Sequence, residues 1–257
     1  NRVFYKKFDL VIIATNSKIR FKIFNYLVKN NISKNIILEK VIYSNLNDYD
    51  KYMNIINTMK INCWVNCLNR VFPISKEIKS KSKNYKLKKI TVIGKNWGLF
   101  CNFIHFLDLA SYLIDSRKIK NVKINIEGVA KSKRAGFSEY FGKLNIDFEK
   151  GNSLMLISKK GETDYNLNID YIKKSYHINE IKSSMKIISK NRILNKKVTM
   201  PKVSNLTKVF VKKILSNKSP GLVKLIDCLE LHQPVIKSLC ENLSVKYNKK
   251  IYDCKIT

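Results

Sequence analysis

The histidine and the aspartate best suited to acid–base chemistry lie three residues apart, at His105 and Asp108. They fall within an apolar stretch, residues 101–113, whose pattern predicts a helix. Residues three apart share a helix face, so the Asp108 carboxylate is able to hold or charge-tune the imidazole. Because the ordinary pKa of histidine is near neutrality, His105 is a candidate general base or acid. The alternative interpretation is an ordinary, partly buried histidine.

Polar pairs that follow three predicted strands form a second group of candidates. The pairs are Thr15 with Asn16, Glu39 with Lys40, and Asn69 with Arg70. In open α/β sheets, ligands bind beyond the carboxyl ends of the strands, so three such pairs point at one crevice. Lys40 is able to donate a hydrogen bond to a reacting oxygen and to stabilise alkoxide character. A single polar pair would mean little, because strand ends are commonly polar.

The elements that position these residues alternate along the first part of the chain. Short apolar segments predict strands, and amphipathic segments predict helices. The predicted strands are residues 9–14, 35–38 and 61–68, and the predicted helices are residues 18–30, 47–60 and 74–82. This alternation predicts a parallel sheet covered on both faces. We therefore assign residues 1–70 to a partial, Rossmann-type dinucleotide-binding domain.

The remaining chain, residues 71–257, predicts an α+β domain for substrate binding and oligomerisation. After a strand and the helix with His105 come six short strand candidates, punctuated by Gly142, Gly151 and Gly161, of which Gly151 and Gly161 lie where hairpin turns are expected. The strands are expected at residues 87–94, 122–129, 144–148, 153–158, 165–169, 175–178 and 184–188. Helices follow at 205–215 and 222–243, and the last is able to pack back on the first domain. The predicted fold class is α/β plus α+β: the C-terminal half of a Rossmann-type parallel sheet, then an open, mainly antiparallel sheet with flanking helices.

No G-x-G-x-x-G sequence occurs in the chain, although a dinucleotide-binding domain carries such a turn after its first strand. Residues 9–14 are also too apolar for the exposed edge of a sheet. We therefore expect a preceding strand–helix–strand portion upstream of Asn1. The acidic residue that usually reads the cofactor ribose would lie there too, which leaves the choice between NAD and NADP open.

Four stretches resemble the Gfo/Idh/MocA oxidoreductase family. Residues 9–16 resemble the family strand that ends beside the cofactor, and Leu38-Glu39-Lys40 resembles the Glu-Lys-Pro motif with Val41 in place of proline. Residues 66–73 are similar to the Asn-Arg region that opens the second domain. Residues 96–108 resemble the His-x-x-Asp helix. The likeness runs from about residue 9 to about residue 241, since Leu231-His232-Gln233 also fits the family's last helix. The order and spacing of the stretches carry the resemblance, because none of them is specific alone.

The resemblance implies an NAD- or NADP-dependent oxidoreductase that transfers hydride to or from a sugar or sugar-nucleotide hydroxyl or carbonyl. It implies Lys40, His105 and Asp108 as catalytic residues. It implies Thr15, Asn16, Glu39 and Lys40 as cofactor-binding residues. It implies Asn69, Arg70, Trp97, Asn102 and His232 as substrate-binding residues. His105 would exchange the hydroxyl proton as the carbonyl forms.

One departure from the family pattern lies on the helix with the histidine. Many members carry an aspartate four residues before that histidine, where this chain has Cys101 followed by Asn102. A thiol does not replace a carboxylate at neutral pH unless its pKa is strongly lowered. The Trp-Gly-x-x-Cys-Asn pattern resembles a subgroup associated with surface-polysaccharide and nucleotide-sugar pathways. The departures keep open a second hypothesis, a catalytically inactive remnant or scaffold with the same fold.

The formal charge of +31, from 50 Lys+Arg against 19 Asp+Glu, raises a third hypothesis, a nucleic-acid-binding protein. That hypothesis predicts lysines clustered on one face with aromatic platforms. The lysines are instead spread along a chain rich in Asn, Ile and Tyr. This spread favours compositional drift and makes a nucleic-acid partner unlikely. A basic surface would still attract an anionic substrate such as a nucleotide sugar.

The cysteines and the apolar segments bear on metals, membranes and partners. Six cysteines form no C-x-x-C pair, and the three histidines do not form a cluster with them, which predicts buried free thiols and no metal site. The apolar runs are too short to span a bilayer, and the first ten residues do not resemble a signal peptide, so we expect a cytoplasmic protein. We also expect a homo-oligomer that forms through the open sheet, because apolar residues on its outer face need a cover.

Overall fold

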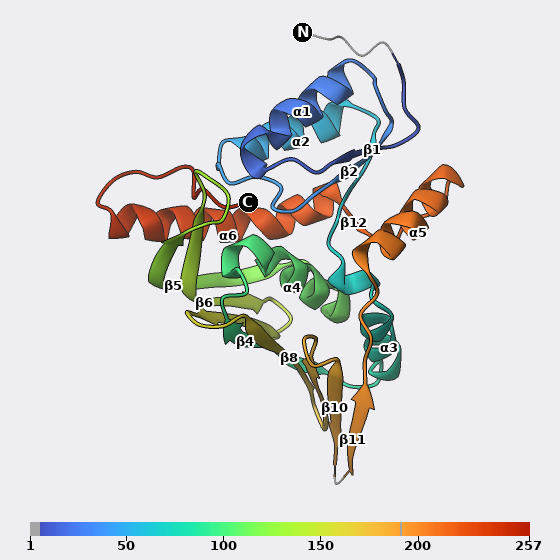
Figure 1. The fold of residues 1–257 in the computed structure, drawn as a ribbon, viewed down its shortest axis with the longest axis vertical. Coiled ribbons are helices and arrows are strands. Elements are labelled where there is room, and N and C mark those ends of the chain that lie inside the picture. The colour runs from blue at the N-terminus through green and yellow to red at the C-terminus, as the bar shows by residue number, and fades with distance from the viewer. Residues whose placement is uncertain (1–5, 191) are drawn as a thin grey trace. The chain divides into compact units, whose positions relative to one another are not determined.

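The computed structural model describes residues 6–190 and 192–257, which form two compact units (Figure 1). Unit 1 combines the part of the chain up to Leu68 with Lys202–Thr257, and unit 2 is Asn69–Pro201. The predicted boundary at residue 70 lies close to this division. Residues 202–257, which the sequence pattern placed in the second domain, pack with unit 1.

Unit 1 contains a four-stranded sheet and four helices. Its strands are β1 (Val11–Ile13), β2 (Asn35–Leu38), β3 (Asn62–Val65) and β12 (Val223–Lys224), and its helices are α1 (Ser17–Lys29), α2 (Asp48–Thr58), α5 (Val203–Leu215) and α6 (Leu225–Lys246). The strand order is β1-β2-β3-β12. The first three strands are parallel, as their apolar runs predict, and β12 is antiparallel to β3.

The apolar side chains of unit 1 explain this arrangement. Ile36, Ile37 and Leu38 of β2 are all buried, because β2 has neighbours on both sides and helices pack on the sheet. Phe24 of α1 packs against Tyr52 of α2, with ring centroids 5.1 Å apart. Both rings are fully buried, so the two helices share one apolar interface.

The start of the last helix differs from the predicted residue 222. Val223 pairs with Val65 as a short strand, and α6 begins at Leu225 and continues to Lys246. The pairing with β3 explains the difference, because a contact across the sheet overrides the helical pattern of the local sequence. After α6 the chain runs back along unit 1, where Asp253 forms an isolated antiparallel β-bridge with Asn45.

Unit 2 contains an eight-stranded sheet, two helices and a short 3-10 turn. The turn is η1 (Asn69–Val71), the helices are α3 (Pro73–Lys81) and α4 (Leu99–Ile114), and the strands are β4 (Leu87–Lys95), β5 (Ile119–Lys131), β6 (Ser138–Phe148), β7 (Ser153–Lys159), β8 (Asp164–Tyr171), β9 (Lys174–Asn179), β10 (Ser184–Ser189) and β11 (Arg192–Lys197). The strand order is β11-β10-β9-β8-β4-β7-β6-β5. All neighbours are antiparallel except β4 and β7, so the predicted open, mainly antiparallel sheet is confirmed.

The core of unit 2 lies between α4 and one face of this sheet. Helix α4 contacts β4, β6 and β7, and Figure 1 shows it lying across them. Ile90, Leu144 and Leu156 come from these three strands and have no exposed surface. The same is true of Phe103 on α4. Alternation along the strands therefore directs one apolar row into the core.

The opposite face of the sheet carries more polar residues than expected. Its central rows include Asn145, Met155, Thr91 and Asn168, which lie side by side on β6, β7, β4 and β8. The predicted association of this face with a second copy stays a prediction. Strand β11 escaped the sequence analysis because its side chains are all exposed, which removes the apolar alternation of a half-buried strand.

Within residues 6–190 and 192–257, no helix is both long enough and apolar enough to cross a lipid bilayer.

Core packing in unit 2 predicts the effect of truncating β7. Leu156→Ala is expected to lower the free energy of unfolding by about 2–5 kcal/mol, because it leaves a cavity under α4. Met155→Ala, one residue away on the opposite face, is the matched control and should cost less than half as much. Urea denaturation of both variants measures the difference. Equal losses would show that the two faces are equally buried.

Candidate active site

The carboxyl ends of β1, β2 and β3 are joined by backbone hydrogen bonds that continue past the strands. Glu39 N donates to Ile13 O at 3.0 Å, and Asn66 N donates to Leu38 O at 2.8 Å. These bonds align the residues that follow the three strands at one edge of the sheet. Thr15, Glu39 and Asn66 follow β1, β2 and β3 at this edge, and we refer to these three residues as the polar row of unit 1.

Two buried oxygens in this polar row lack partners. Asn66 Nδ2 donates to Glu39 Oε1 at 2.6 Å, which leaves Asn66 Oδ1 buried. Among the described residues, neither Asn66 Oδ1 nor the buried Thr15 Oγ1 has a hydrogen-bond partner. An unpaired buried polar atom is costly, so this edge is suited to a ligand that brings its own hydrogen-bonding groups. Asn66 was not among the predicted site residues, although the stretch that resembles the family includes it.

Arg20 holds two strand ends together and was also missed. Its guanidinium is buried and donates to the carbonyls of Thr15 and Val41, which follow β1 and β2. The only sequence signal was an arginine on the buried side of a predicted helix, which is an uncommon place for a charge. Arg20 thereby positions the segment that contains Lys40.

Asn16 and Lys40 each follow a strand of unit 1. Asn16 caps α1, and its Oδ1 accepts a hydrogen bond from Ile19 N at 3.4 Å. Capping satisfies an orphan amide of the first turn and gives Asn16 a structural role. Lys40 is half-buried and directly follows Glu39, and the Lys40–Val41 peptide bond is cis.

His232 is fully buried in unit 1. It lies on α6 beside Tyr43, with ring centroids 5.0 Å apart. Burial lowers the pKa of His232 to about 3, with a smaller lowering by the Arg20 charge. The imidazole is therefore neutral in the folded protein. This environment explains His232 as a packing residue and not as a group exposed to a substrate.

In unit 2, Asp108 forms a buried ion pair with Arg70. Arg70 Nε lies 2.8 Å from Asp108 Oδ2, and the Asp108 side chain has no exposed surface. The guanidinium also lies over the Tyr112 ring, 5.3 Å from its centroid. The two candidates were assigned separate roles from the sequence, whereas the structure joins them. Arg70 comes from η1, which packs against α4.

His105 is half-buried on α4, one turn after Cys101. A carboxylate from a different element lies near that turn: Glu139 of β6 has both oxygens 3.8 Å from Cys101 Sγ. Cys101 occupies the position at which the family pattern has an aspartate. The carboxylate near this position comes instead from the sheet, from Glu139. The sequence analysis missed Glu139, because it lies far from Cys101 in the chain.

Trp97 and Asn102 form a local support at the start of α4. Trp97 is buried and donates from Nε1 to Ile157 O at 2.8 Å, and its ring packs on Phe106. Asn102 Nδ2 donates to Trp97 O at 2.6 Å. Through these hydrogen bonds Trp97 and Asn102 hold the start of α4 in position. Asn69, the remaining candidate, is buried in η1.

No group of three or more His, Cys, Asp or Glu side chains suited to a metal ion occurs among the described residues. All six cysteines are free and buried. Burial raises the pKa of the thiols of Cys63 and Cys254, so these two stay protonated and inert in the folded state.

Solved structures share this fold across most of the chain. A dehydrogenase (MviM) from Clostridium difficile matches with a TM-score of 0.66 and 14% identity, over 91% of this chain and 79% of that chain. UDP-N-acetylglucosamine 3-dehydrogenase GnnA from Acidithiobacillus ferrooxidans matches with a TM-score of 0.71 and 12% identity, over 90% and 77%. The chain has the fold of the Gfo/Idh/MocA-type dehydrogenases.

A third match carries a cofactor and a small acid. It is an oxidoreductase from Agrobacterium radiobacter in complex with NAD+, L-tartaric acid and magnesium, with a TM-score of 0.69, 13% identity and coverage of 90% of this chain and 78% of that chain. No family model and no curated protein sequence matches this chain. The likeness is therefore one of structure, and it confirms the fold that the sequence resemblance implied.

The buried pair of Arg70 and Asp108 predicts non-additive effects on stability. Arg70→Leu removes the ion-pair partner of the buried Asp108 carboxylate and should lower the free energy of unfolding by about 3–5 kcal/mol. The double variant with Asp108→Leu removes both charges and should cost less than Arg70→Leu alone. Chemical denaturation of the two single variants and the double variant tests this. Losses that simply add would mean that the two groups do not interact.

Burial of His232 predicts a pH dependence of stability. Its pKa is about 3 when folded and 6.5 ordinarily, so below pH 6.5 only the unfolded state takes up the proton. Stability is therefore highest above pH 6.5 and falls by up to about 1.4 kcal/mol per pH unit as the pH drops toward 3. Urea unfolding at pH 7 and pH 5 should show a smaller drop for His232→Leu than for the unaltered protein. Identical drops would rule out this origin.

Proposed function

We propose that this chain is a nicotinamide-dependent oxidoreductase of the Gfo/Idh/MocA type, acting on a hydroxyl or carbonyl of a sugar or sugar nucleotide. The observation that carries the proposal is the polar row of Thr15, Glu39 and Asn66 at the carboxyl ends of parallel strands. In open α/β sheets this edge is where ligands bind. The fold supports the general class, since similar structures include a UDP-sugar dehydrogenase and a protein in complex with NAD+.

The polar row fits a nicotinamide cofactor. Thr15 Oγ1 donates or accepts a hydrogen bond, and Asn66 Oδ1 accepts one. The carboxamide and the ribose hydroxyls of NAD or NADP offer the complementary groups. The bound nicotinamide would accept or supply the hydride. The 2.6 Å hydrogen bond from Asn66 Nδ2 to Glu39 Oε1 fixes the orientation of the Asn66 amide. Asn66 Oδ1 is therefore directed away from Glu39.

In this proposal His105 exchanges the proton of the reacting hydroxyl, and Lys40 stabilises the reacting oxygen. The ordinary pKa of an imidazole lies near neutral pH, which suits proton exchange with an alcohol. The Lys40 ammonium would stabilise alkoxide character on the same oxygen. The two residues belong to different units, and their assignment to one reaction rests on the resemblance to the family.

The buried charges of unit 2 support His105 indirectly. Asp108 lies one helical turn after His105, and its ion pair with Arg70 at 2.8 Å holds the carboxylate in place beside that helix face. Arg70 and Asn69 remain the proposed contacts to the sugar. Trp97 and Asn102 act as positioning residues, because their hydrogen bonds hold the start of α4.

Cofactor binding tests the polar row directly. Titration of the chain with NADH and NADPH, followed by nicotinamide fluorescence, should show saturable binding. Asn66→Ala should weaken binding by about tenfold, which is the effect of losing one well-placed hydrogen bond of 1–2 kcal/mol. Asn62→Ala is the matched control, since Asn62 is exposed at the opposite end of β3, and it should change affinity less than twofold.

Turnover tests the assigned catalytic residues. A screen of sugars and nucleotide sugars with both cofactors should identify a substrate, for which His105→Ala and Lys40→Ala lower kcat by about 100-fold or more. His177→Ala, a half-buried histidine on β9, is the control and should leave kcat unchanged. If no cofactor binds at millimolar concentration, the catalytic assignment falls and the inactive scaffold with this fold takes its place.

A further inference from the structure

A cavity of about 500 Å³ opens at the C-terminal end of α4, within unit 2. Its walls come from the end of α3 and the connection to β4, from the last residues of α4, from the turn before β7 and from the end of β8. The volume lies in the range of sites that hold small molecules. None of the residues in the proposed oxidoreductase site lines this cavity.

Four lysines and one aspartate line the cavity: Lys79, Lys83, Lys86, Lys150 and Asp115. Two of the lysines stabilise the end of α4. Lys79 Nζ donates to Tyr112 O at 2.6 Å and pairs with Asp115, and Lys150 Nζ donates to Asp115 O at 3.0 Å. These bonds satisfy orphan carbonyls and offset the negative end of the helix dipole.

The other two lysines have no such role. Lys83 and Lys86 are exposed, and within the described chain their ammonium groups make no hydrogen bond or ion pair. Lys79 and Lys150 already match Asp115 and the helix end, so the charges of Lys83 and Lys86 remain uncompensated at the cavity wall. Two uncompensated ammonium groups beside one cavity favour a multivalent anion such as a phosphate group.

A buried acceptor in the wall points to the rest of the ligand. Asn152 is 6% exposed, and its Nδ2 donates to Leu87 O at 2.5 Å. Its Oδ1 is buried and has no partner among the described residues. Because an unsatisfied buried carbonyl oxygen is costly, a ligand that brings a hydroxyl donor would relieve that cost.

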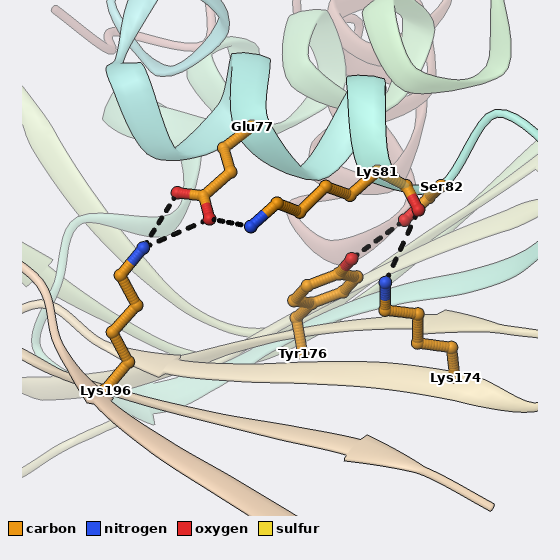
Figure 2. A network of polar contacts seen from close by, with 6 residues as sticks. All are labelled: Glu77, Lys81, Ser82, Lys174, Tyr176 and Lys196. Carbon is orange, nitrogen blue, oxygen red and sulfur yellow. Dashed lines mark hydrogen bonds and ion pairs between the residues drawn. The ribbon is translucent and has the colours of Figure 1, made fainter.

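The wall formed by the end of α3 is held in place by a polar network (Figure 2). Glu77 accepts hydrogen bonds from Lys81 and Lys196, which lower the pKa of its carboxyl group. The Ser82 hydroxyl lies 3.0 Å from Tyr176 Oη. The network joins α3 to β9 and β11 and so supports this wall of the cavity.

Tyr171, an aromatic residue in the cavity wall, adds no negative charge that would repel an anion. Tyr171 lines the cavity and is 7% exposed. Burial raises the pKa of Tyr171 to about 12, so its hydroxyl stays protonated and uncharged at neutral pH.

We propose that this cavity binds a small organic phosphate that bears hydroxyl groups, such as a sugar phosphate. Lys83 and Lys86 bind the phosphate, and Asn152 Oδ1 accepts a hydrogen bond from a hydroxyl. The site is separate from the proposed oxidoreductase site and does not depend on it.

Ribose 5-phosphate and inorganic phosphate are the probes, titrated by calorimetry into the full chain at low ionic strength without nicotinamide cofactor. We expect saturable binding of ribose 5-phosphate that is tighter than that of inorganic phosphate. The double variant Lys83→Ala and Lys86→Ala should weaken binding about tenfold or more, through loss of charge-assisted hydrogen bonds. Both lysines are exposed, so the variant is expected to fold normally.

The double variant Lys123→Ala and Lys131→Ala is the matched control. It removes the same charge from exposed positions of β5, outside the cavity, and should change affinity less than twofold. Equal weakening by the two double variants would mean diffuse attraction to a basic chain and would overturn the proposal. Absence of binding at millimolar ribose 5-phosphate, or equal affinity for the two probes, would also overturn it.

Discussion

Backbone pairing among the three parallel strands of unit 1 sets the position of its polar side chains. The hydrogen bonds continue one residue beyond the strands, from Glu39 N to Ile13 O and from Asn66 N to Leu38 O. A slip of one residue in either pairing would turn Glu39 or Asn66 to the other face of the sheet. Arg20 adds a second constraint, since its guanidinium ties the carbonyls that follow β1 and β2. The polar row depends on both.

Unit 2 accommodates buried ionisable groups in a different way from unit 1. Asp108 is paired with Arg70 at 2.8 Å, whereas His232 in unit 1 is neutral because burial lowers its pKa. A partner of opposite charge offsets the cost of burying a charge, and burial by itself favours the neutral form of a base. The same principle separates the lysines of the α4 cavity, where Lys79 has partners and Lys83 remains available.

The large positive charge acquires meaning only at particular places. Most lysines lie along exposed strands and helix faces, as compositional drift would leave them. At the end of α4, however, two of them lie beside a cavity with a buried amide oxygen, Asn152 Oδ1. Charge alone would not single out this place. The combination of uncompensated charge, an open cavity and an unsatisfied acceptor singles it out.

The sequence by itself determined the local structure and the fold class. Apolar runs such as residues 35–38 predict buried parallel strands, and the spacing of His105 and Asp108 places both on one helix. It also predicted that polar residues such as Glu39 follow the strands of the first sheet. These features depend on residues near one another in the chain, so periodicity reveals them.

Only the tertiary structure decided which side chains meet. Asp108 pairs with Arg70 from η1, Asn66 holds Glu39 from the neighbouring strand, and Glu139 of β6 lies beside Cys101. The start of α6 moved for the same reason, because β12 pairs with β3. Each of these contacts joins segments far apart in the chain. No local pattern encodes them, since the geometry of the sheet and its helices brings them together.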